Sequence, residues 1–271
     1  MGGHMGFSVL SWNVEHFGGG ETPARQNRVV KHIKDQDPDI FGILEVENAD
    51  IRKLMETSFP DHDFFLTDGP QLQEILIGCR RGVFDQKLFV QKREYQEGND
   101  KLRPGALLSV RQGTEWTNLL FLHADSGVDA GAFGNRFDNF RKVWSLAKAI
   151  ARKAPNGAPR MLVLGDFNTM GLSYPGKKKL ELRVAADLEV SGLAELAKKE
   201  GLVLLPKSHP ATYWSATYGE SNLDHVLASE DLAATVKKVE VRGWVQEPTE
   251  AAKKKWTAEL SDHSSLNVAC G

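Results

Sequence analysis

Short apolar runs that end on polar residues recur along this chain, and they constrain its fold more than any other feature. Such runs, bounded by polar residues or glycine, are typical of buried β-strands. A strand that is apolar almost to its end and then changes to Asn, Asp, Glu or His carries those side chains to the edge of a sheet, where sites are commonly built. Five clusters follow this pattern: Asn13–Glu15, Glu45, His123–Ser126, Gly165–Asn168 and Ser261–His263.

The side chains in these clusters suit phosphate ester hydrolysis. A phosphodiester is anionic and resists attack by water. A site that cleaves it needs a metal ion, a group that positions or deprotonates water, and donors for the developing oxyanions. Two histidines, His123 and His263, supply proton transfer and hydrogen-bond donation near neutral pH. Hard oxygen ligands of the kind that Mg²⁺ or Mn²⁺ prefers are present as carboxylates and one carboxamide: Glu45, Asn13, Glu15 and Asp262.

In this order the motifs resemble the endonuclease/exonuclease/phosphatase superfamily, which includes deoxyribonuclease I, apurinic endonucleases, sphingomyelinases and inositol phosphatases. The resemblance extends from Leu10 to Leu266. It implies a four-layer α/β/β/α sandwich, in which two packed mixed sheets are flanked by helices and the site lies at one end. The motifs that carry it are Ser11–Glu15, Asp37–Glu45, Gly165–Asn168, Asn222–Val226 and Ser261–Ser264.

The resemblance implies a metal site at the first two motifs. Glu45 would hold the Mg²⁺ or Mn²⁺ ion with Asn13 nearby, and Asp262 and Glu15 complete the candidate ligand set. Glu15 stands where apurinic endonucleases tend to have aspartate, and its extra methylene changes how near the carboxylate comes to the metal. The number of metal ions, one or two, therefore stays open.

The resemblance also implies catalytic roles for the later motifs. Asp166 would align or deprotonate the attacking water, and Asn168 would orient the phosphate. His263 would contact the scissile phosphate, with Asp224 holding its ring. A carboxylate on one imidazole nitrogen sets the tautomer and favours the charged form, so the pairing is physically sound.

Four further residues belong to the candidate site. His123 occupies the position where deoxyribonuclease I-like members carry a second histidine, and Glu74 resembles the glutamate that supports this histidine in them. Arg136, near the start of an expected helix, could contact phosphate through its planar guanidinium group. Ser126 could touch phosphate as well, although it could instead shape the His123 loop by local hydrogen bonds.

Several of these residues also have structural interpretations. An aspartate after a strand is most often a turn former or a helix cap. The catalytic interpretation of Asp166 therefore depends on the other motifs that occur in order along the chain. His225 follows Asp224 in a strand, and alternation turns it to the opposite face, which favours a structural role. Trp214 and Tyr218 could stack on a base or a lipid, but aromatic residues in strand-rich segments are more often part of the core.

Composition indicates one domain over residues 7–271, with residues 1–6 as an expression-tag remnant. A chain of 271 residues with 41% hydrophobic residues can bury a large core. No run of eighteen apolar residues predicts a membrane span, and two cysteines make neither a disulfide framework nor a zinc site. We expect a soluble monomer. The compartment stays open, with the cytoplasm favoured and secretion not excluded.

The net charge of −2 argues against broad electrostatic capture of nucleic acid. Two lysine triplets, Lys177–Lys179 and Lys253–Lys255, are more typical of solvated surfaces than of DNA contacts. The leading hypothesis is a metal-dependent phosphodiesterase, a nuclease that hydrolyses DNA by in-line attack of water. A phosphatase or a phosphodiesterase acting on phospholipids or small molecules is the enzymatic alternative. A binding protein without turnover is the third possibility, although no matched catalytic position carries an inert residue.

Periodicity predicts the elements themselves. Helices are expected over residues 22–36, 139–152 and 185–200, where apolar residues recur at helical spacing. Strands are expected around residues 7–13, 39–45, 62–67, 74–80, 106–111, 117–123, 160–165, 222–228, 236–243 and 264–268.

Overall fold

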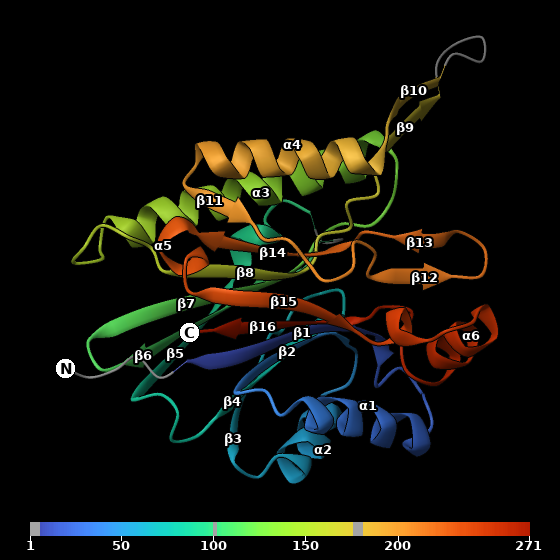
Figure 1. Ribbon diagram of the computed structural model, residues 1–271, viewed down its shortest axis with the longest axis horizontal. Helices are drawn as coiled ribbons and strands as arrows, with labels where there is room; N and C mark the ends of the chain where they lie inside the picture. The colour runs from blue at the N-terminus through green and yellow to red at the C-terminus, as the bar shows by residue number, and fades with distance from the viewer. Residues whose placement is uncertain (1–5, 100–101, 176–180) are drawn as a thin grey trace.

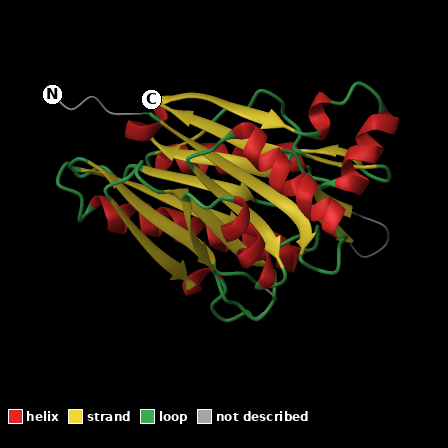
Figure 2. Cartoon of the chain, turned by 90° about the horizontal axis from the view of Figure 1, so that it is seen from below, coloured by secondary structure: helices red, strands yellow, loops and turns green. Residues whose placement is uncertain are grey.

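The computed structural model describes residues 6–99, 102–175 and 181–271. Two six-stranded sheets lie face to face, and helices cover the outer face of each (Figure 1). The predicted four-layer α/β/β/α sandwich is therefore confirmed. Figure 2 shows the same layers from below, with the strands of the two sheets running between the helices. Among the described residues, no helix is long and apolar enough to cross a membrane.

The first sheet contains the start and the end of the chain. Parallel pairing joins β1 to β2, whereas the other neighbours in this sheet are antiparallel. The order across the sheet is β15 (Val236–Arg242), β16 (Ser265–Cys270), β1 (Phe7–Phe17), β2 (Ile40–Val46), β4 (Glu74–Arg80) and β3 (His62–Leu66).

The second sheet is built from the middle of the chain, and its one parallel pair is β7 with β8. Two hairpins extend beyond the sheets at one end of the molecule (Figure 1), β9 (Leu172–Pro175) with β10 (Glu181–Val184) and β12 (Tyr213–Ser215) with β13 (Gly219–Ser221). The order across the second sheet is β11 (Leu202–Leu204), β14 (Asp224–Ser229), β8 (Met161–Asp166), β7 (Glu115–His123), β6 (Gly105–Gln112) and β5 (Gln86–Lys92).

Apolar residues fill three layers. The inward faces of both sheets form the central core, with residues such as Leu44, Phe121 and Leu164. The first sheet packs against α1 (Pro23–Gln36) and α2 (Asp50–Ser58), and the second against α3 (Ala130–Ala151) and α4 (Ala186–Lys199). Shorter helices complete the described chain: η1 (Arg93–Tyr95), α5 (Glu230–Ala233), η3 (Trp244–Gln246) and α6 (Glu250–Glu259).

All ten predicted strands and all three predicted helices are present, with some differences at their ends. Helix α3 begins at Ala130 rather than at residue 139, because Asp129 caps it by accepting hydrogen bonds from the N–H groups of Gly131 and Ala132. Strand β5 was not predicted. It lies at a sheet edge, where Leu88 and Val90 are exposed and the apolar run of three residues is flanked by Lys87 and Gln91, so the sequence shows neither a long apolar run nor a clear alternation.

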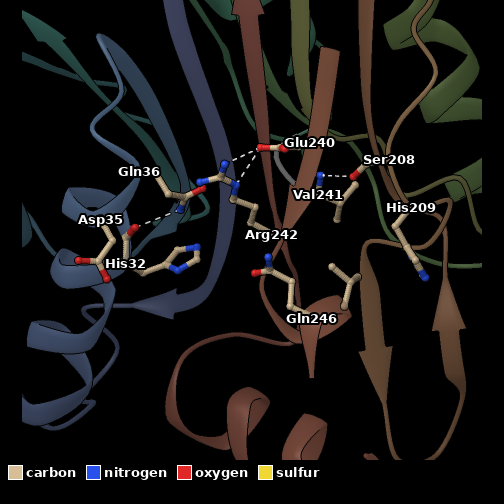
Figure 3. A pocket seen from close by; sticks show the side chains of 10 residues that line it. His32, Asp35, Gln36, Ser208, His209, Glu240, Val241, Arg242 and Gln246 are labelled. Carbon is tan, nitrogen blue, oxygen red and sulfur yellow. Dashed lines mark hydrogen bonds and ion pairs between the residues drawn. The ribbon is translucent and has the colours of Figure 1, made fainter. Parts of the chain in front are cut away.

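A pocket of about 550 Å³ lies between α1 and β15, away from the residues singled out by the sequence. Figure 3 shows that the Arg242 guanidinium pairs with Glu240 and that the Gln36 amide donates to the backbone oxygen of His32. The His32 ring also packs against Trp12, with ring centroids 4.6 Å apart. Burial lowers the pKa of His32 to about 4.

Because the unfolded chain binds a proton at His32 more readily, this histidine makes stability depend on pH. Its contribution is fully present above pH ~6.5 and is lost as the pH falls towards 4. We expect the free energy of unfolding to fall by roughly 2–3 kcal/mol between pH 7 and 4.5 through this residue. Urea denaturation of wild type and His32→Gln at both pH values checks the prediction, and an identical pH dependence in the two proteins would contradict it.

Candidate active site

Three neighbouring strands of the second sheet bring polar residues to the same edge. Parallel pairing places His123, the last residue of β7, opposite Asp166, the last residue of β8. Antiparallel pairing places Asp224, the first residue of β14, opposite Asp166 on its other side. The strand ends thus place Asp166 between His123 and Asp224. The polar clusters in the sequence predicted that His123 and Asp166 reach a sheet edge, but not which residues lie beside each other.

Local irregularities in the first sheet direct its residues towards the same point. The pairing of β1 with β2 shifts register between Asn13 and Phe17, and Glu15, His16 and Glu45 adopt left-handed backbone conformations with φ of 45°, 53° and 63°. Such bulges re-aim side chains near active sites. As a result, Nδ2 of Asn13 donates to Oε1 of Glu45 at 2.9 Å and to Oδ2 of Asp166 at 3.1 Å.

His263 and Asp224 form a buried pair. Nδ1 of His263 lies 2.7 Å from Oδ2 of Asp224, and its Nε2 lies 3.7 Å from Oδ2 of Asp166. Burial disfavours the charged ring, but Asp224 and Asp166 outweigh it and hold the pKa of His263 well above its ordinary value. The ring is therefore an imidazolium with its Nε2–H directed at the centre of the site.

Ser261 positions the segment that carries His263. Its hydroxyl donates to the backbone oxygen of Asn13 at 2.7 Å and accepts from the backbone N–H of His263 at 3.0 Å. The indole Nε1 of Trp12 donates to the backbone oxygen of His263 at 2.8 Å. The last polar motif is thus attached to the first, although 248 residues separate Ser261 from Asn13.

His123 differs from His263 in being uncharged at neutral pH. Its Nε2 lies 3.5 Å from Oε1 of Glu45 and 3.8 Å from Oδ2 of Asp166. Burial, assisted by the nearby Arg103 guanidinium, lowers the pKa of His123 to about 3, so the ring is neutral at neutral pH. One neutral and one charged imidazole therefore face the same aspartate.

The predicted support of His123 by Glu74 is wrong. Oε2 of Glu74 accepts from the Thr67 hydroxyl at 2.5 Å, and Oε1 accepts from the backbone N–H of Gly69 at 2.8 Å. Within the described ranges, Nδ1 of His123 is buried without a hydrogen-bond partner. Glu74 instead fixes the loop between β3 and β4, because both of its carboxylate oxygens accept from donors of that segment.

Asp166 and Asn168 are held by backbone groups. Oδ1 of Asp166 accepts from the backbone N–H of Asn168 at 2.9 Å, and Nδ2 of Asn168 donates to the backbone oxygen of Ala124 at 3.0 Å. Asn168 itself has a left-handed conformation with φ of 50°. Burial, with Asp224 adding to it, raises the pKa of Asp166 to about 7, although His263 acts against the rise. A carboxylate of this kind is suited to accept a proton near neutral pH.

A second group of carboxylates surrounds Glu45. Burial, together with the charges of Glu15 and Glu45, raises the pKa of Asp262 to about 6. Burial also favours the neutral form of Glu45, but the His123 ring, which is protonated at the low pH where Glu45 titrates, and the hydrogen bonds from Asn13 and His16 lower the pKa of Glu45 to about 2. Crowded oxygen donors with an ionised carboxylate among them fit a hard divalent cation, because the cation relieves their mutual repulsion.

Ligand atoms of Asp166, Asp224 and His263 also lie within 4.8 Å of one another and could hold a metal ion. In this cluster, however, the Nδ1–H of His263 is already donated to Asp224. A cation bound there would have to break that hydrogen bond and displace a charged imidazole. The carboxylates at Glu45 form no cluster of this kind among the described residues, so their role as cation ligands stays a prediction.

The predicted phosphate contact of Arg136 is wrong. This side chain is fully buried, and its Nε and one terminal nitrogen donate to the two carboxylate oxygens of Glu189 at 2.7 and 3.0 Å. Its remaining donors reach the backbone oxygens of Gly127 and Gly171 at 2.7 and 2.8 Å. Arg136 joins the loop after β7 to the loop after β8. Ser126 is exposed in the first of these loops, and its contact with phosphate stays a prediction.

Arg103 belongs near the site but was missed by sequence reasoning. Its Nε donates to Oε1 of Gln73 at 2.9 Å, and its charge interacts with Glu45 and Asp166. Burial lowers the pKa of this guanidinium. Because Arg103 precedes β6 in a segment without any polar motif, nothing in the local sequence marks it.

The remaining residues that the sequence singled out are a histidine, two aromatic residues and two lysine triplets. His225 is buried, with Nε2 at 2.8 Å from the Thr169 hydroxyl, which confirms a structural role. Trp214 is buried as expected, but Tyr218 is 80% exposed on the turn between β12 and β13, so its assignment to the core is wrong. Lys253 is paired with Glu220, whereas Lys177–Lys179 lie outside the described residues.

Comparison with known proteins gives a family match over most of the chain and several structures with the same fold. The model of the endonuclease/exonuclease/phosphatase family matches residues 10–263. No curated protein matches the sequence.

Several solved structures share the fold. Truncated TDP2 from Caenorhabditis elegans is 17% identical, with 98% of this chain and 97% of that chain covered and a TM-score of 0.65. The 3′ phosphatase NExo from Neisseria, solved with a product DNA hairpin, is 15% identical, with 98% and 99% covered and a TM-score of 0.67. TDP2 from D. rerio, solved with a single-strand DNA product, is 17% identical, with 99% and 100% covered and a TM-score of 0.66.

Proposed function

Because the chain belongs to the endonuclease/exonuclease/phosphatase family, whose members hydrolyse phosphoesters, we propose that it cleaves phosphodiester bonds in DNA with the help of Mg²⁺ or Mn²⁺. The observation that carries the proposal is the convergence on Asp166. Its Oδ2 lies 3.1 Å from the Asn13 amide, 3.7 Å from the charged His263 ring and 3.8 Å from the neutral His123 ring. A base and several donors thus surround one point.

The charge states assign a role to each side chain. Oδ2 of Asp166 accepts the proton of the attacking water, and the backbone N–H of Asn168 keeps the carboxylate in place. The Nε2–H of His263 donates to a non-bridging phosphate oxygen, where negative charge develops, and Asp224 holds the ring at 2.7 Å. The neutral imidazole of His123 lies beside Oε1 of Glu45 and Oδ2 of Asp166.

Glu45, Asn13, Asp262 and Glu15 are the residues that would hold a divalent cation. When bound, such an ion supplies Lewis acidity and neutralises phosphate charge. Glu45 is held for this task by the Asn13 amide and by the backbone N–H of His16, whose N lies 3.1 Å from Oε2 of Glu45.

DNA is proposed as the substrate because two of the similar structures, NExo and TDP2 from D. rerio, were solved with DNA products. Phosphomonoester hydrolysis is the second candidate, since NExo is described as a 3′ phosphatase. The test is cleavage of single-stranded DNA, duplex DNA, 3′-phosphorylated DNA and bis-p-nitrophenyl phosphate with Mg²⁺, Mn²⁺ or EDTA. Cleavage of none of them in the presence of either metal would refute the proposal.

Glu45→Gln tests the proposed cation site. We expect the Mg²⁺ concentration for half-maximal activity to rise by at least ~10-fold, because an anionic oxygen ligand becomes neutral. The measurement is a Mg²⁺ titration of diester cleavage, with Glu56→Gln on the surface of α2 as the matched control. An unchanged titration midpoint for Glu45→Gln would remove this residue from the ligand set.

Substitution of Arg103 tests how much positive charge near the site contributes to kcat/KM. We expect Arg103→Ala to lower kcat/KM by ~10–100-fold, because a partly buried guanidinium next to Glu45 and Asp166 would no longer attract the anionic substrate. Arg103→Lys should recover only part of the loss, since lysine lacks the planar fork. Steady-state kinetics of these variants and of Arg141→Ala, on the exposed face of α3, decide the matter. Wild-type kcat/KM in Arg103→Ala would contradict it.

A further inference from the structure

A groove of about 920 Å³ lies beside the candidate active site. It is lined by residues of the β9–β10 and β12–β13 hairpins, which extend from the same end of the sandwich (Figure 1), and by the start of α4. Part of a substrate bound at the site could therefore lie in this groove.

The walls of the groove expose large apolar side chains. Val128 is 42% exposed, Met170 is 38% exposed and Tyr218 is 80% exposed, and all three line it. Apolar side chains gathered in one concave place are typical of binding sites, whereas single exposed ones are not informative. The groove therefore favours a ligand that has a flat or apolar surface.

Two residues of the groove wall are direct chain neighbours of catalytic residues. Thr169 follows Asn168 directly, and Leu223 directly precedes Asp224, so consecutive Cα atoms separate wall and site by only about 3.8 Å. The backbone N–H of Phe167 donates to the backbone oxygen of Leu223 at 2.9 Å, which joins the two segments. The groove wall therefore begins one residue away from the groups that would hold a phosphate at Asp166.

The walls are also held in place before any ligand binds. The backbone N–H of Gly127 donates to Sδ of Met170 at 3.3 Å, and that of Ser173 donates to the backbone oxygen of Val128 at 2.6 Å. On the other side, the Thr169 hydroxyl donates to the backbone oxygen of Asn222 at 2.6 Å. A preformed groove of this kind loses little conformational entropy on binding.

Polar groups at the margin favour a nucleobase over a lipid chain. Asn222, Glu220 and Asp187 line the groove together with the apolar side chains. Glu220 and Asn222 already accept hydrogen bonds from Lys253 and Lys207, at 2.7 and 2.6 Å. An alkyl chain would cover their remaining polar atoms without hydrogen-bonding them, which is unfavourable, whereas a base has polar edges and a flat face that can stack on Tyr218. The net charge of −2 also offers little general attraction for duplex DNA, so stacking has to supply binding energy.

We propose that this groove binds an unpaired nucleobase next to the scissile phosphate, and that the enzyme acts on single-stranded DNA or frayed ends in preference to duplex DNA. The inference rests on the proposed function and specifies its substrate. Tyr218 provides the stacking surface, and Met170 and Val128 provide the apolar walls.

The experiment compares single-stranded oligonucleotides that carry a base, or an abasic linker, on either side of the cleaved bond. For wild type, removal of the base should raise KM by ~5–100-fold at one of these positions, the scale of one base–aromatic stack. In Tyr218→Ala the same removal should change KM by less than ~2-fold. The control, Leu88→Ala, replaces an exposed apolar residue of β5 outside the groove and should keep the wild-type difference.

An undiminished effect of base removal in Tyr218→Ala would overturn the inference, as would equal kcat/KM for duplex and single strand. Preferential hydrolysis of phosphatidylcholine in mixed micelles over DNA would also overturn it, in favour of a lipid. Failure to cleave any substrate, bis-p-nitrophenyl phosphate included, would instead refute the proposed function. The groove is then tested by fluorescence anisotropy of a labelled single strand in EDTA, where equal affinity of wild type and Tyr218→Ala overturns the inference.

Discussion

Asp166→Asn is expected to lower kcat by ~10²–10⁴-fold, the usual scale for the loss of a general base. The substitution keeps the size of the side chain and an oxygen that can accept from the Asn168 N–H. It removes the carboxylate that faces the charged His263 ring at 3.7 Å and that we propose as the acceptor of the water proton. The measurement is single-turnover cleavage of an oligonucleotide with Mg²⁺, with folding verified by circular dichroism.

The matched control for Asp166→Asn is Asp138→Asn. Asp138 lies on the surface of α3, where it forms an ion pair with Lys142. The control makes the same chemical change away from the site, so it should leave kcat within about two-fold of wild type, as surface ion pairs contribute little. If Asp166→Asn retained more than a tenth of wild-type kcat, Asp166 would not be the base.

Gly165→Ala is expected to destabilise the protein by at least ~3 kcal/mol or to prevent folding. Gly165 has φ of 139°, a conformation that residues with a Cβ rarely adopt, and a Cβ built there would lie 2.0 Å from the backbone oxygen of Leu122. That oxygen belongs to the neighbouring strand β7, so relief would require the strands that carry His123 and Asp166 to separate. Urea denaturation followed by tryptophan fluorescence measures the effect.

Gly134→Ala provides the comparison for Gly165. Gly134 lies within α3, and a Cβ built on it meets no atom within 4 Å. The same substitution should therefore stabilise the protein by roughly 0.5–1 kcal/mol, because alanine restricts the unfolded chain and favours the helix. Equal stabilities of the two variants would show that the left-handed position and the close approach to Leu122 do not matter.

Much of the site could be predicted because strand ends are marked in the sequence. An apolar run that stops at Asp166 or His123 shows where a buried strand reaches the sheet edge, and this local pattern does not depend on the rest of the fold. Seven predicted residues are joined in one cluster by hydrogen bonds and short charge contacts between their side chains: Asn13, Glu45, His123, Asp166, Asp224, Asp262 and His263.

The partners of charged side chains could not be predicted in the same way. Arg136 pairs with Glu189, which is 53 residues further along the chain, so a sequence window around the arginine contains no sign that its donors are used. Glu74 was assigned to His123 by resemblance, but the Thr67 hydroxyl and the Gly69 N–H occupy its oxygens. Arg103 is a candidate site residue only because its charge interacts with those of Glu45 and Asp166, which lie on other strands.

The sequence by itself determined the strand ends and the chemical types of the site, because periodicity and polarity are local properties of the chain. It predicted the sandwich through the resemblance that its motifs carry to a known family. The tertiary structure alone decided which charges meet, which of the two histidines is protonated, and where a groove remains open. The physical reason is that burial and Coulomb interactions depend on distances between residues far apart in sequence. His263 and His123 are the same amino acid, yet Asp224 keeps one charged, whereas burial and Arg103 keep the other neutral.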